Sequence, residues 1–591
     1  MCGIQLLVTT NQVSEDPKYE RIWDLLKLAN SKRGPDYSGY ETITIGGKGC
    51  EIQLSFGAHV LNLRGEKTPQ PFIDPCTGDL LLFNGEIFSG LQIGLGDNDG
   101  VRLFEMLQNL GNDSDSIFKI FSTIRGPYSF VYFKKTVGKI WFGRDFLGRR
   151  SLLKHVGLDK NIFVLSSTGY ENNDSKFWEE VCAPYIHCLD VSSIEPNSDI
   201  NSYLTSYKWE YDSDTTGNSN LVLPFNRVNT EVLEDMEDSK ENMQITNIKE
   251  YRPSQKTVAN IKDLHNLLMN SVKVRVETSP GAGFAVLFSG GLDCMVLAAL
   301  MDSVVPKNEA IELINVAFAN PRILKSQAHK TKSKTKRNDQ KEENSTGLVS
   351  FNEKQVINEY NVPDRKTGLA GVKELRESYP QRKWHWIEVN VPYSQVLEHK
   401  QHIVDLLGPN STVMDFSIGM ALWFAARGKG TLVQDENSEP TKEFKSSSKV
   451  LILGMGADEQ FGGYSRHREG YNFGGLEKLA NESEFRQVLL TKLDFDSNVF
   501  LGRDDRIVSD HGKESRFPYL DETLVNYLSM LKINEKMDMR LPRGIGDKLL
   551  LRLLANSMNL PVASMQAKRA IQFGARTAKM ESGKDKGHDI L

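Results

Sequence analysis

The sequence predicts two domains of different architecture, an α+β domain followed by a doubly wound α/β domain. From residue 4 to about residue 190, short apolar strands with turn signals are interrupted by two helical stretches, which indicates an α+β domain with an extensive sheet. From residue 284 onward, short apolar runs alternate with helical segments, which is typical of a parallel sheet in a doubly wound domain. Residues 212–249 between them are polar and acidic, as in a linker or mobile excursion.

In the first domain, each expected strand is a short apolar run between turn signals. These runs are Ile4–Val8, Ile43–Ile45, Leu80–Phe83, Tyr128–Phe133, Ile140–Phe142 and Phe163–Ser166. Helices are expected over Tyr19–Asn30 and Val101–Leu110. We place the domain at residues 2–200 and the linker at residues 201–255.

The second domain, residues 256–580, begins with a helical pattern over Leu264–Val276 and a buried strand at Phe284–Phe288. A glycine turn and a helix over Met295–Val304 follow, and further buried strands are expected at Ile311–Phe318, Trp384–Val389 and Val450–Leu453. Disordered insertions are expected near residues 325–350 and 434–448. The first is rich in lysine, so a nuclear signal or a nucleic acid contact is an alternative, but it lacks aromatic residues for stacking on bases.

Size and composition exclude several classes of protein. With 591 residues the chain can hold two or three domains, each with its own core. The net charge of −5 and the 25% of charged residues give no overall field that would attract nucleic acid or a membrane surface. No run approaches the roughly 18 apolar residues of a membrane span, and the N-terminus lacks the pattern of an export signal. Six cysteines without metal-binding spacing suit reduced thiols, so we expect a cytoplasmic protein.

Cys2 is the first candidate catalytic residue. Removal of Met1 would give one residue both a thiol and a free α-amine, which titrates near pH ~8 and can take the proton of a thiol whose ordinary pKa is ~8.5. The alternative is an ordinary residue near the start of a chain.

Four sequence islands support the catalytic interpretation, because together and in this order they closely resemble the class II glutamine amidotransferase domain. They are Met1-Cys2-Gly3-Ile4, Arg33-Gly34-Pro35-Asp36, Asn84-Gly85-Glu86-Ile87, and Phe142–Asp145 with Leu147–Arg150. The resemblance implies an N-terminal nucleophile hydrolase fold, an αββα sandwich, in which Cys2 attacks the side-chain amide of glutamine. Asn84 and the Gly85 backbone N–H would form the oxyanion hole, where each donor can lower the barrier by ~3 kcal/mol.

The same resemblance implies that Glu86 and Asp99 bind the α-amino group of glutamine, as carboxylates facing an ammonium do. One departure affects glutamine binding. The family has an arginine two residues after the histidine that resembles His59, and this chain has Leu61 there. Arg64 is the nearby substitute for binding the glutamine carboxylate.

In the second domain, Ser289, Gly290, Gly291 and Asp293 form a glycine loop between the buried strand and the helix. Backbone N–H groups at a helix N-terminus bind phosphate, and an aspartate there can bring Mg²⁺ to it. No GK[ST] follows, so the loop is not a Walker A motif.

SGGLD after an apolar strand resembles the pyrophosphate loop of the ATP pyrophosphatase family, and Gly454–Tyr464 resembles the second acidic loop of that fold, which is adenine nucleotide alpha-hydrolase-like. The resemblance implies that Asp293 and Asp458 share the metal and that Lys568 stabilises transition-state charge beside the adenylate. It also implies that the nucleotide and its pyrophosphate are bound by Ser289, Gly290, Gly291, Asp293, Val316, Gly454, Asp458 and Glu459.

The whole chain therefore resembles the asparagine synthetase family, and within it the eukaryotic asparagine synthetase domain-containing proteins, through Arg144–Leu153 and Tyr464–Arg468. The resemblance implies a glutamine-hydrolysing, asparagine synthase-like carbon–nitrogen ligase of amino-acid biosynthesis. Such an enzyme uses glutamine, ATP and Mg²⁺ and amidates a carboxylate acceptor through an acyl-adenylate. We expect no membrane or nucleic acid partner.

Three departures concern the synthetase half: Met455 replaces a glutamate, Cys294 replaces a serine, and Asp415 aligns with an arginine near the aspartate acceptor. A carboxylate there would repel aspartate, which favours an acceptor other than free aspartate. The alternative is a catalytically impaired homologue that acts as a binding or regulatory protein. The sequence leaves open the acceptor, the activity of the synthetase half, the order of the insertions and the oligomeric state, a homodimer among the options.

Overall fold

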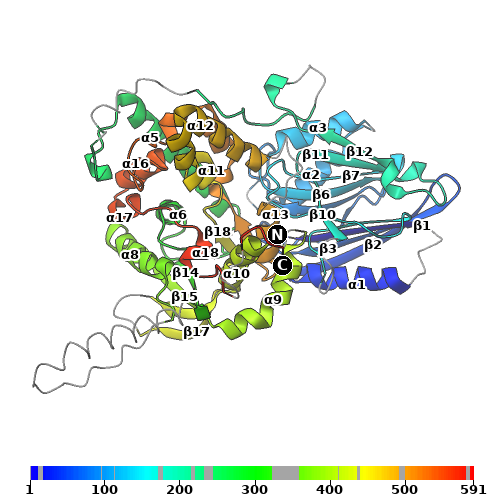
Figure 1. The fold of residues 1–591 in the computed structure, drawn as a ribbon. Helices are drawn as coiled ribbons and strands as arrows, with labels where there is room; N and C mark the ends of the chain where they lie inside the picture. The colour runs from blue at the N-terminus through cyan, green and yellow to red at the C-terminus, as the bar shows by residue number, and fades with distance from the viewer. Residues whose placement is uncertain are drawn as a thin grey trace, which may run out of the picture.

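The computed structural model describes residues 2–10, 17–94, 96–111, 113–170, 177–214, 220–231, 242, 244–322, 359–409, 412–434, 439–491, 500–580 and 586–590. Within them, the expected strands and helices of both domains are confirmed. The expected insertion at 325–350 lies outside the described residues. Figure 1 shows the first domain on the right and the second on the left.

The described part of the first domain contains two antiparallel sheets of six strands each. The first has the order β10 (Trp178–Glu180), β8 (Leu153–His155), β9 (Ile162–Ser166), β1 (Gly3–Thr10), β3 (Glu51–Val60), β2 (Tyr37–Gly46). The second has the order β12 (Leu204–Lys208), β11 (Tyr185–Asp190), β7 (Lys139–Arg144), β6 (Tyr128–Lys134), β5 (Leu80–Gly85), β4 (Phe72–Ile73).

These two sheets pack face to face between helices, because their strands alternate apolar residues between two faces. Ile4 of β1 packs in the inner core with Phe133 and Phe142 of the other sheet. Leu7 faces the opposite way and packs against α1 (Pro17–Ser31). The outer face of the second sheet is covered by α2 (Asp99–Gln108) and α3 (Ser114–Thr123). The domain is therefore an α+β sandwich with the layers α, β, β, α.

The described second domain is built on a seven-stranded sheet. Its order is β17 (Thr441–Lys445), β16 (Lys429–Val433), β15 (Trp384–Val391), β14 (Ile311–Phe318), β13 (Phe284–Leu287), β18 (Val450–Ile452), β19 (Glu514–Arg516). The strands from β15 to β19 in this order are parallel, and β16 and β17 are antiparallel. The chain leaves β13 toward β14 on one side and returns to β18 on the other, so the loops after β13 and β18 meet at a topological switch point, where ligands bind in this class of sheet.

Helices cover both faces of this sheet. One face packs against α5 (Gln255–Glu277), α6 (Leu292–Val304), α8 (Pro363–Ser378) and α16 (Leu549–Ser557). The other face packs against α9 (Tyr393–Leu407), α10 (Val413–Arg427) and α13 (Phe500–Ser509). The remaining helices are α11 (Ala457–Phe461), α12 (Ser465–Thr491), α14 (Glu522–Met530), α15 (Ile533–Lys536), α17 (Pro561–Ser564) and α18 (Ile571–Gly574). None of the helices in the described ranges is long and apolar enough to cross a membrane.

Two segments differ from the sequence-based expectation. Within the expected linker 201–255, β12 extends the second sheet, and Trp209 and Leu223 are buried in the core beneath it. Within the expected insertion 434–448, β17 pairs with β16 and Ser446 and Ser448 are buried. The first segment carries apolar residues where it docks. In the second, Ser446 and Ser448 donate hydrogen bonds to the buried Glu312 carboxylate. Composition alone hides both patterns.

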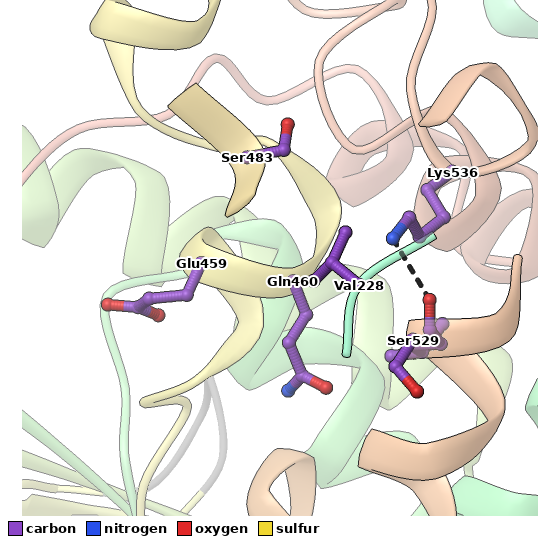
Figure 2. Close-up of a pocket in the computed structure, with 7 residues that line it drawn as sticks. Val228, Glu459, Gln460, Ser483, Ser529 and Lys536 are labelled. Atoms are coloured by element: carbon purple, nitrogen blue, oxygen red, sulfur yellow. Dashed lines mark hydrogen bonds between the residues drawn. The ribbon is translucent and has the colours of Figure 1, made fainter. Parts of the chain in front are cut away.

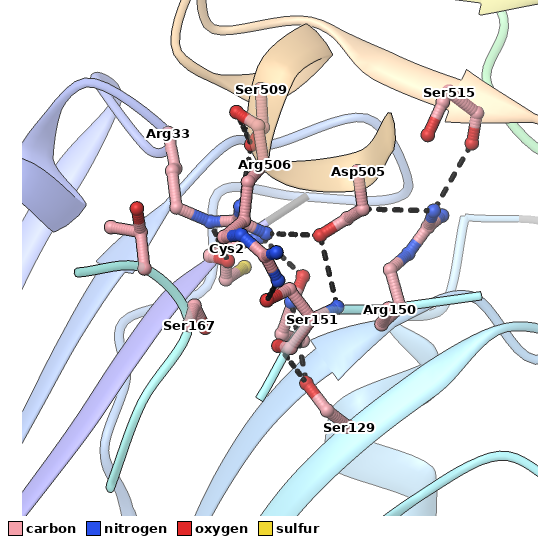
Figure 3. Close-up of polar contacts among 12 residues, drawn as sticks. Cys2, Arg33, Ser129, Arg150, Ser151, Ser167, Asp505, Arg506, Ser509 and Ser515 are labelled. Atoms are coloured by element: carbon pink, nitrogen blue, oxygen red, sulfur yellow. Dashed lines mark hydrogen bonds and ion pairs between the residues drawn. The ribbon is translucent and has the colours of Figure 1, made fainter. Parts of the chain in front are cut away.

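The two domains meet through buried ion pairs centred on Asp505 of α13 (Figure 3). The Asp505 carboxylate lies 2.7 Å from Arg33 Nη2 and 3.5 Å from Arg150 Nη1, and it accepts a 3.0 Å hydrogen bond from Ser151 N. All three partners belong to the first domain, and Asp505 is fully buried. Arg506, the next residue, pairs with Glu180 at 2.7 Å. The orientation of the domains is thus set by charged groups that have no access to water.

The substitution Asp505→Asn tests this interface. Because it leaves the buried guanidinium of Arg33 without its carboxylate, we expect the free energy of unfolding to fall by about 3 kcal/mol. Urea unfolding followed by tryptophan fluorescence measures the change. The matched control is Asp97→Asn, which breaks an exposed pair with Arg102 and should leave the midpoint unchanged. Equal midpoints for both variants would contradict the role of Asp505.

Candidate functional site

Cys2 lies directly before the central strand β1 and is held from both sides of its backbone. Its N–H donates a 2.8 Å hydrogen bond to Asn84 Oδ1, and its carbonyl accepts one of 3.3 Å from Arg33 Nε. The thiol accepts a 3.7 Å hydrogen bond from Gln70 Nε2. Burial raises the pKa of the thiol, while the backbone N–H of Leu61 opposes the shift. The sulfur is therefore fixed in position and needs a nearby base to ionise at neutral pH.

Asn84 and Gly85 end strand β5 next to Cys2. Asn84 Nδ2 donates to Ser129 Oγ at 3.4 Å, so the amide oxygen is turned toward the Cys2 backbone. A side chain at position 85 would place its Cβ 2.5 Å from the carbonyl oxygen of Pro127, so only glycine fits there. The structure thus brings Cys2, Asn84 and Gly85 together.

Glu86 and Asp99 form a buried acidic pair flanked by two arginines. Arg64 Nη1 lies 3.9 Å from Glu86 Oε2 and 4.0 Å from Asp99 Oδ2, and Arg516 Nη2 lies 3.5 Å from Glu86 Oε1. Burial, together with the neighbouring Asp99, raises the pKa of Glu86 to about 8. Among the described residues, Glu86 Oε2 has no hydrogen-bond partner. A cationic or hydrogen-bond-donating ligand at this oxygen would therefore satisfy a buried acceptor.

Leu61, which stands where the family has an arginine, packs in the apolar core. Its side chain is buried with Leu63 and Tyr519 in an apolar cluster shared with the second domain. His59, two residues earlier, contacts Ser38 Oγ through Nδ1 at 2.8 Å, and burial lowers its pKa to about 4. His59 is thus neutral at physiological pH, and the positive charge near the acidic pair comes from Arg64 and Arg516.

At the second candidate site, the loop of Ser289, Gly290 and Gly291 joins β13 to the N-terminus of α6. Gly290 has a φ of +72°, and a Cβ there would lie 2.1 Å from the Thr367 carbonyl oxygen, so this turn needs glycine. Gly291 caps α6 without a side-chain hydrogen bond to the helix. The first N–H groups of a 13-residue helix are thus left for an anion.

Asp293, in the first turn of α6, and Asp458, in the first turn of α11, converge on one ammonium group, that of Lys548. Lys548 Nζ lies 2.6 Å from Asp293 Oδ1 and 2.7 Å from Asp458 Oδ1, and Lys568 also pairs with Asp458. Burial alone would raise the pKa of Asp458, but Lys548 and Lys568 outweigh it and hold this pKa well below its ordinary value. For Lys568, Asp458 outweighs burial and raises the pKa of the ammonium. Lys568 is therefore fully charged at neutral pH.

Asp293 and Asp458 suit a Mg²⁺ site that is completed by water and substrate better than a metal site built entirely from protein ligands. In the described part of the chain, no cluster of three or more His, Cys, Asp or Glu side chains could hold a metal ion. Mg²⁺ commonly takes one or two carboxylates and completes its shell with water and substrate phosphates. The oxygens of Asp293 and Asp458 already lie close enough to share one cation, the Lys548 ammonium.

The other predicted residues of this site lie around the same two loops. Gly454 approaches Asp293 so closely that a Cβ would lie 3.1 Å from the Asp293 Cβ. Val316 is buried on β14, two residues beyond Ile314, which pairs with Leu287 at the end of β13. Val316 therefore lies level with the Ser289 loop.

Glu459 lies at the edge of this site. Its carboxylate receives a hydrogen bond from Tyr464 OH, and burial together with Asp458 raises its pKa. It borders a small cavity, shown in Figure 2, in which Lys536 donates a 2.9 Å hydrogen bond to the Leu528 carbonyl oxygen. The cavity is lined by Val228, Glu459, Gln460, Ser483, Leu528, Ser529 and Lys536.

Lys548 and Arg516 contact the candidate site residues, but the sequence analysis did not single them out. Nothing in their spacing along the chain shows which distant carboxylates they contact. Asp415 is buried, pairs with Arg503 and accepts a hydrogen bond from Thr412 at the start of α10. Arg503 also pairs with Asp504 at 2.8 Å, so two carboxylates share one guanidinium. The expectation that Asp415 repels an aspartate acceptor stays a prediction.

Comparison with known proteins gives the following. No protein-family model matches the chain. Asparagine synthetase domain-containing protein 1 of Homo sapiens is 36% identical over 648 residues, which cover 100% of this chain and 97% of that protein. An asparagine synthetase domain-containing protein of Saccharomyces cerevisiae is 31% identical over 577 residues, 95% of this chain and 89% of the relative. One of Drosophila melanogaster is 30% identical over 627 residues and the full length of both chains.

Among solved structures, the chain is similar to the glutamine phosphoribosylpyrophosphate amidotransferase from B. subtilis complexed with ADP and GMP. The sequence identity is 15%, the match covers 53% of this chain and 65% of that one, and the TM-score is 0.26. A likeness this weak carries no argument.

The substitution Lys548→Met tests the charge balance of the second site. Without the ammonium, two carboxylates face each other, so we expect a loss of about 2 kcal/mol in unfolding free energy at pH 7. The depressed pKa of Asp458 contributes stability that is present above its ordinary value of 3.8 and is lost as the pH falls below it. The difference from wild type should therefore shrink below pH 4. Urea unfolding at pH 7 and pH 3.5 measures it.

The matched control is Lys442→Met at an exposed position on β17, which should match wild type at both pH values. A Lys548→Met variant that is as stable as wild type at pH 7 would show that the lysine is not needed to balance the two aspartates.

Proposed function

Because the chain belongs to the family of asparagine synthetase domain-containing proteins, we propose that it is a carbon–nitrogen ligase that takes nitrogen from glutamine and uses ATP to activate a carboxylate. One observation carries the proposal: a single chain holds both a cysteine fixed by Asn84 and a phosphate-type loop whose Asp293 meets Asp458 and Lys548. The first arrangement suits amide hydrolysis and the second suits nucleotide chemistry. Glutamine and ATP are the substrates of the two sites, and the third substrate is the carboxylate acceptor.

At the first site, removal of Met1 would free the α-amine of Cys2 to take the proton from its own thiol. The thiolate attacks the side-chain amide carbon of glutamine, and the oxyanion receives hydrogen bonds from Asn84 Nδ2 and the Gly85 N–H. Ammonia leaves as the amine returns its proton, and water then hydrolyses the thioester to glutamate and restores the thiol.

Recognition of glutamine follows from the charges around this site. The α-ammonium would bind Glu86 and Asp99, filling the unsatisfied Oε2 of Glu86. Arg64, which already lies within 4.0 Å of both carboxylates, would turn to the α-carboxylate. Leu61 then has no part in binding, because its side chain belongs to the apolar cluster.

At the second site, the acceptor carboxylate attacks the α-phosphorus of ATP, pyrophosphate leaves, and an acyl-adenylate forms. The N–H groups after Gly291 and the hydroxyl of Ser289 would bind phosphate oxygens, with Val316 beside the nucleoside and Gly454 and Glu459 at the rim. Asp293 and Asp458 would hold Mg²⁺, which neutralises phosphate charge. Lys548 and Lys568 would stabilise the negative charge of the phosphates. Ammonia from the first site then attacks the acyl carbon and AMP leaves.

A second candidate function, a binding or regulatory protein without ligase activity, is favoured by Met455. In the family a glutamate assists adenylate chemistry at this position, and methionine can neither accept a proton nor bind Mg²⁺ well. Met455 instead packs against the apolar cluster beneath the sheet. The two candidates differ in whether pyrophosphate is released.

The proposal predicts glutamate and pyrophosphate release in the presence of glutamine, ATP, Mg²⁺ and a panel of carboxylates that includes aspartate. Cys2→Ala should lose glutamate formation by at least 1,000-fold but keep ammonia-dependent pyrophosphate release, because the second site is intact. Cys76→Ala, at an exposed cysteine, is the matched control and should match wild type. Intact-mass analysis checks that Met1 is removed. Nucleotide binding without either product would favour the regulatory protein.

Glu86 predicts how glutamine binding depends on pH. Its raised pKa means that the carboxyl is mostly protonated below pH 8, and only the ionised form attracts an ammonium. The KM for glutamine should therefore fall as the pH rises from 6 to 8, by up to about tenfold per unit. Initial rates across this range measure it. Glu86→Gln should raise KM and flatten the profile, and Glu66→Gln, at an exposed position, should retain the wild-type profile. A pH-independent wild-type KM would refute this role of Glu86.

A further inference from the structure

A buried clasp of Asp145, Arg149 and Glu522 joins the domains at a second place, separate from Asp505. Arg149 Nε lies 2.9 Å from Asp145 Oδ1 and Arg149 Nη2 lies 2.6 Å from Glu522 Oε1. All three residues are at most 3% exposed. We propose that Arg149 is a positioning residue that couples nucleotide binding at the second site to the reactivity of Cys2 at the first. This inference rests on the proposed function, because it needs ligands at both sites.

The segment next to Glu522 touches both acidic loops of the second site. It consists of the short helix Pro518–Leu520 and Asp521. Tyr519 OH donates a 3.1 Å hydrogen bond to the carbonyl oxygen of Asp293, and the Tyr519 carbonyl accepts one of 2.6 Å from Gln460 Nε2. Leu520 packs so tightly on Gly456 that a Cβ there would lie 2.4 Å from its side chain. Movement of either loop upon nucleotide binding must therefore displace this segment or strain it.

Arg149 and Glu522 hold the same segment to the first domain. Arg149 Nη1 donates a 2.9 Å hydrogen bond to the Leu520 carbonyl oxygen. Arg149 Nη2 donates one of 2.7 Å to the Gly126 carbonyl oxygen, and Glu522 Oε1 accepts one of 2.9 Å from the Gly126 N–H. Both backbone groups of Gly126 are thus bonded to the clasp.

Gly126 in turn lies against the loop that carries Glu86. A Cβ at Gly126 would lie 2.0 Å from the Glu86 carbonyl oxygen. On either side of Gly126, the Pro127 carbonyl accepts a 2.9 Å hydrogen bond from Glu86 N, and the Arg125 carbonyl accepts one of 2.8 Å from Phe88 N. A shift of the clasp therefore reaches Glu86, and through Gly85 and Asn84 the backbone of Cys2.

The contacts run without a break from Asp293 through Tyr519, Leu520, Arg149 and Gly126 to Glu86. Hydrogen bonds join Tyr519 to Asp293 and Arg149 to both Leu520 and Gly126, and Gly126 packs directly against the Glu86 carbonyl. Continuity alone is compatible with a clasp that only stabilises the domain interface. Coupling predicts something that a purely structural role does not. Nucleotide binding must change the reactivity of Cys2, and this change must disappear when substitutions remove the clasp.

The experiment uses the full-length protein and a diazoketone analogue of glutamine, which alkylates a cysteine thiolate in a glutamine site. The rate of Cys2 labelling is measured by intact mass with and without an ATP analogue that cannot release pyrophosphate, in the presence of Mg²⁺. Nucleotide binding is measured separately by calorimetry. In wild type we expect nucleotide to accelerate labelling at least fivefold.

The main variant is Arg149→Met with Glu522→Gln, which removes the pair between the domains without leaving Glu522 buried as an unpaired charge. Asp145 keeps hydrogen bonds from the N–H groups of Tyr128, Leu147 and Arg149. We expect the labelling rate without nucleotide to remain within threefold of the wild-type rate. The ratio of the labelling rates with and without nucleotide should fall to less than two. The matched control, Arg102→Met with Glu105→Gln, removes an exposed pair in the same domain and should keep the full acceleration.

The outcomes separate the inference from the proposed function. Wild type that neither labels nor binds nucleotide overturns the proposed function and the coupling with it. Wild type that labels and binds nucleotide, but whose labelling rate nucleotide leaves unchanged, overturns the coupling alone. Retention of the full acceleration in the double variant also overturns it. If the double variant does not fold, Tyr519→Phe decides, since it removes only the hydrogen bond to Asp293 and should lower the acceleration at least twofold.

Discussion

The arrangement of this protein depends on one buried carboxylate, that of Asp505, which belongs to the second domain but is surrounded by groups of the first. Through Arg33 it reaches the carbonyl of Cys2, so the position of the candidate nucleophile depends on a helix that lies 500 residues further along the chain. Burying a carboxylate and two guanidinium groups costs several kcal/mol each unless the geometry is well matched. Such an interface has little tolerance for rotation, and it makes the two domains a single structural unit.

The two candidate sites share one structural feature. Each lies where strands end: Cys2 before β1 and Asn84 at the end of β5 in the sandwich, and the loops after β13 and β18 at the switch point of the parallel sheet. Strand ends free the backbone for close approach, and the sheets fix the position of each loop. β19 serves both sites. Its backbone pairs with β18 beside the Gly454 loop, while Arg516 on the same strand reaches Glu86.

Local patterns predicted the secondary-structure elements. The run Phe284–Phe288 and the helix after it are short-range signals, and the structure confirms both. The motifs around Cys2, Asn84 and Asp293 are also short-range signals, and the structure places Cys2 in contact with Asn84. Lys548, Arg516 and Asp505 contact partners that lie 90 to 472 residues away in the sequence, and no spacing rule reveals such pairs. The charge of Asp415 is visible in the sequence, but its pairing with Arg503, 88 residues away, is not. Polar composition likewise hid the docking of β12 and β17.

The central claim is that one chain carries nitrogen from glutamine to an acyl-adenylate. The most direct measurement supplies glutamine labelled with ¹⁵N in its side-chain amide, together with ATP, Mg²⁺, the carboxylate panel and a large excess of unlabelled ammonium. Mass spectrometry then determines the label in the amide product and the ratio of that product to AMP. The account predicts an amide that retains ¹⁵N and appears in equal amount with AMP. A product that carries the unlabelled nitrogen, or glutamate formation with no amide and no AMP, would contradict it.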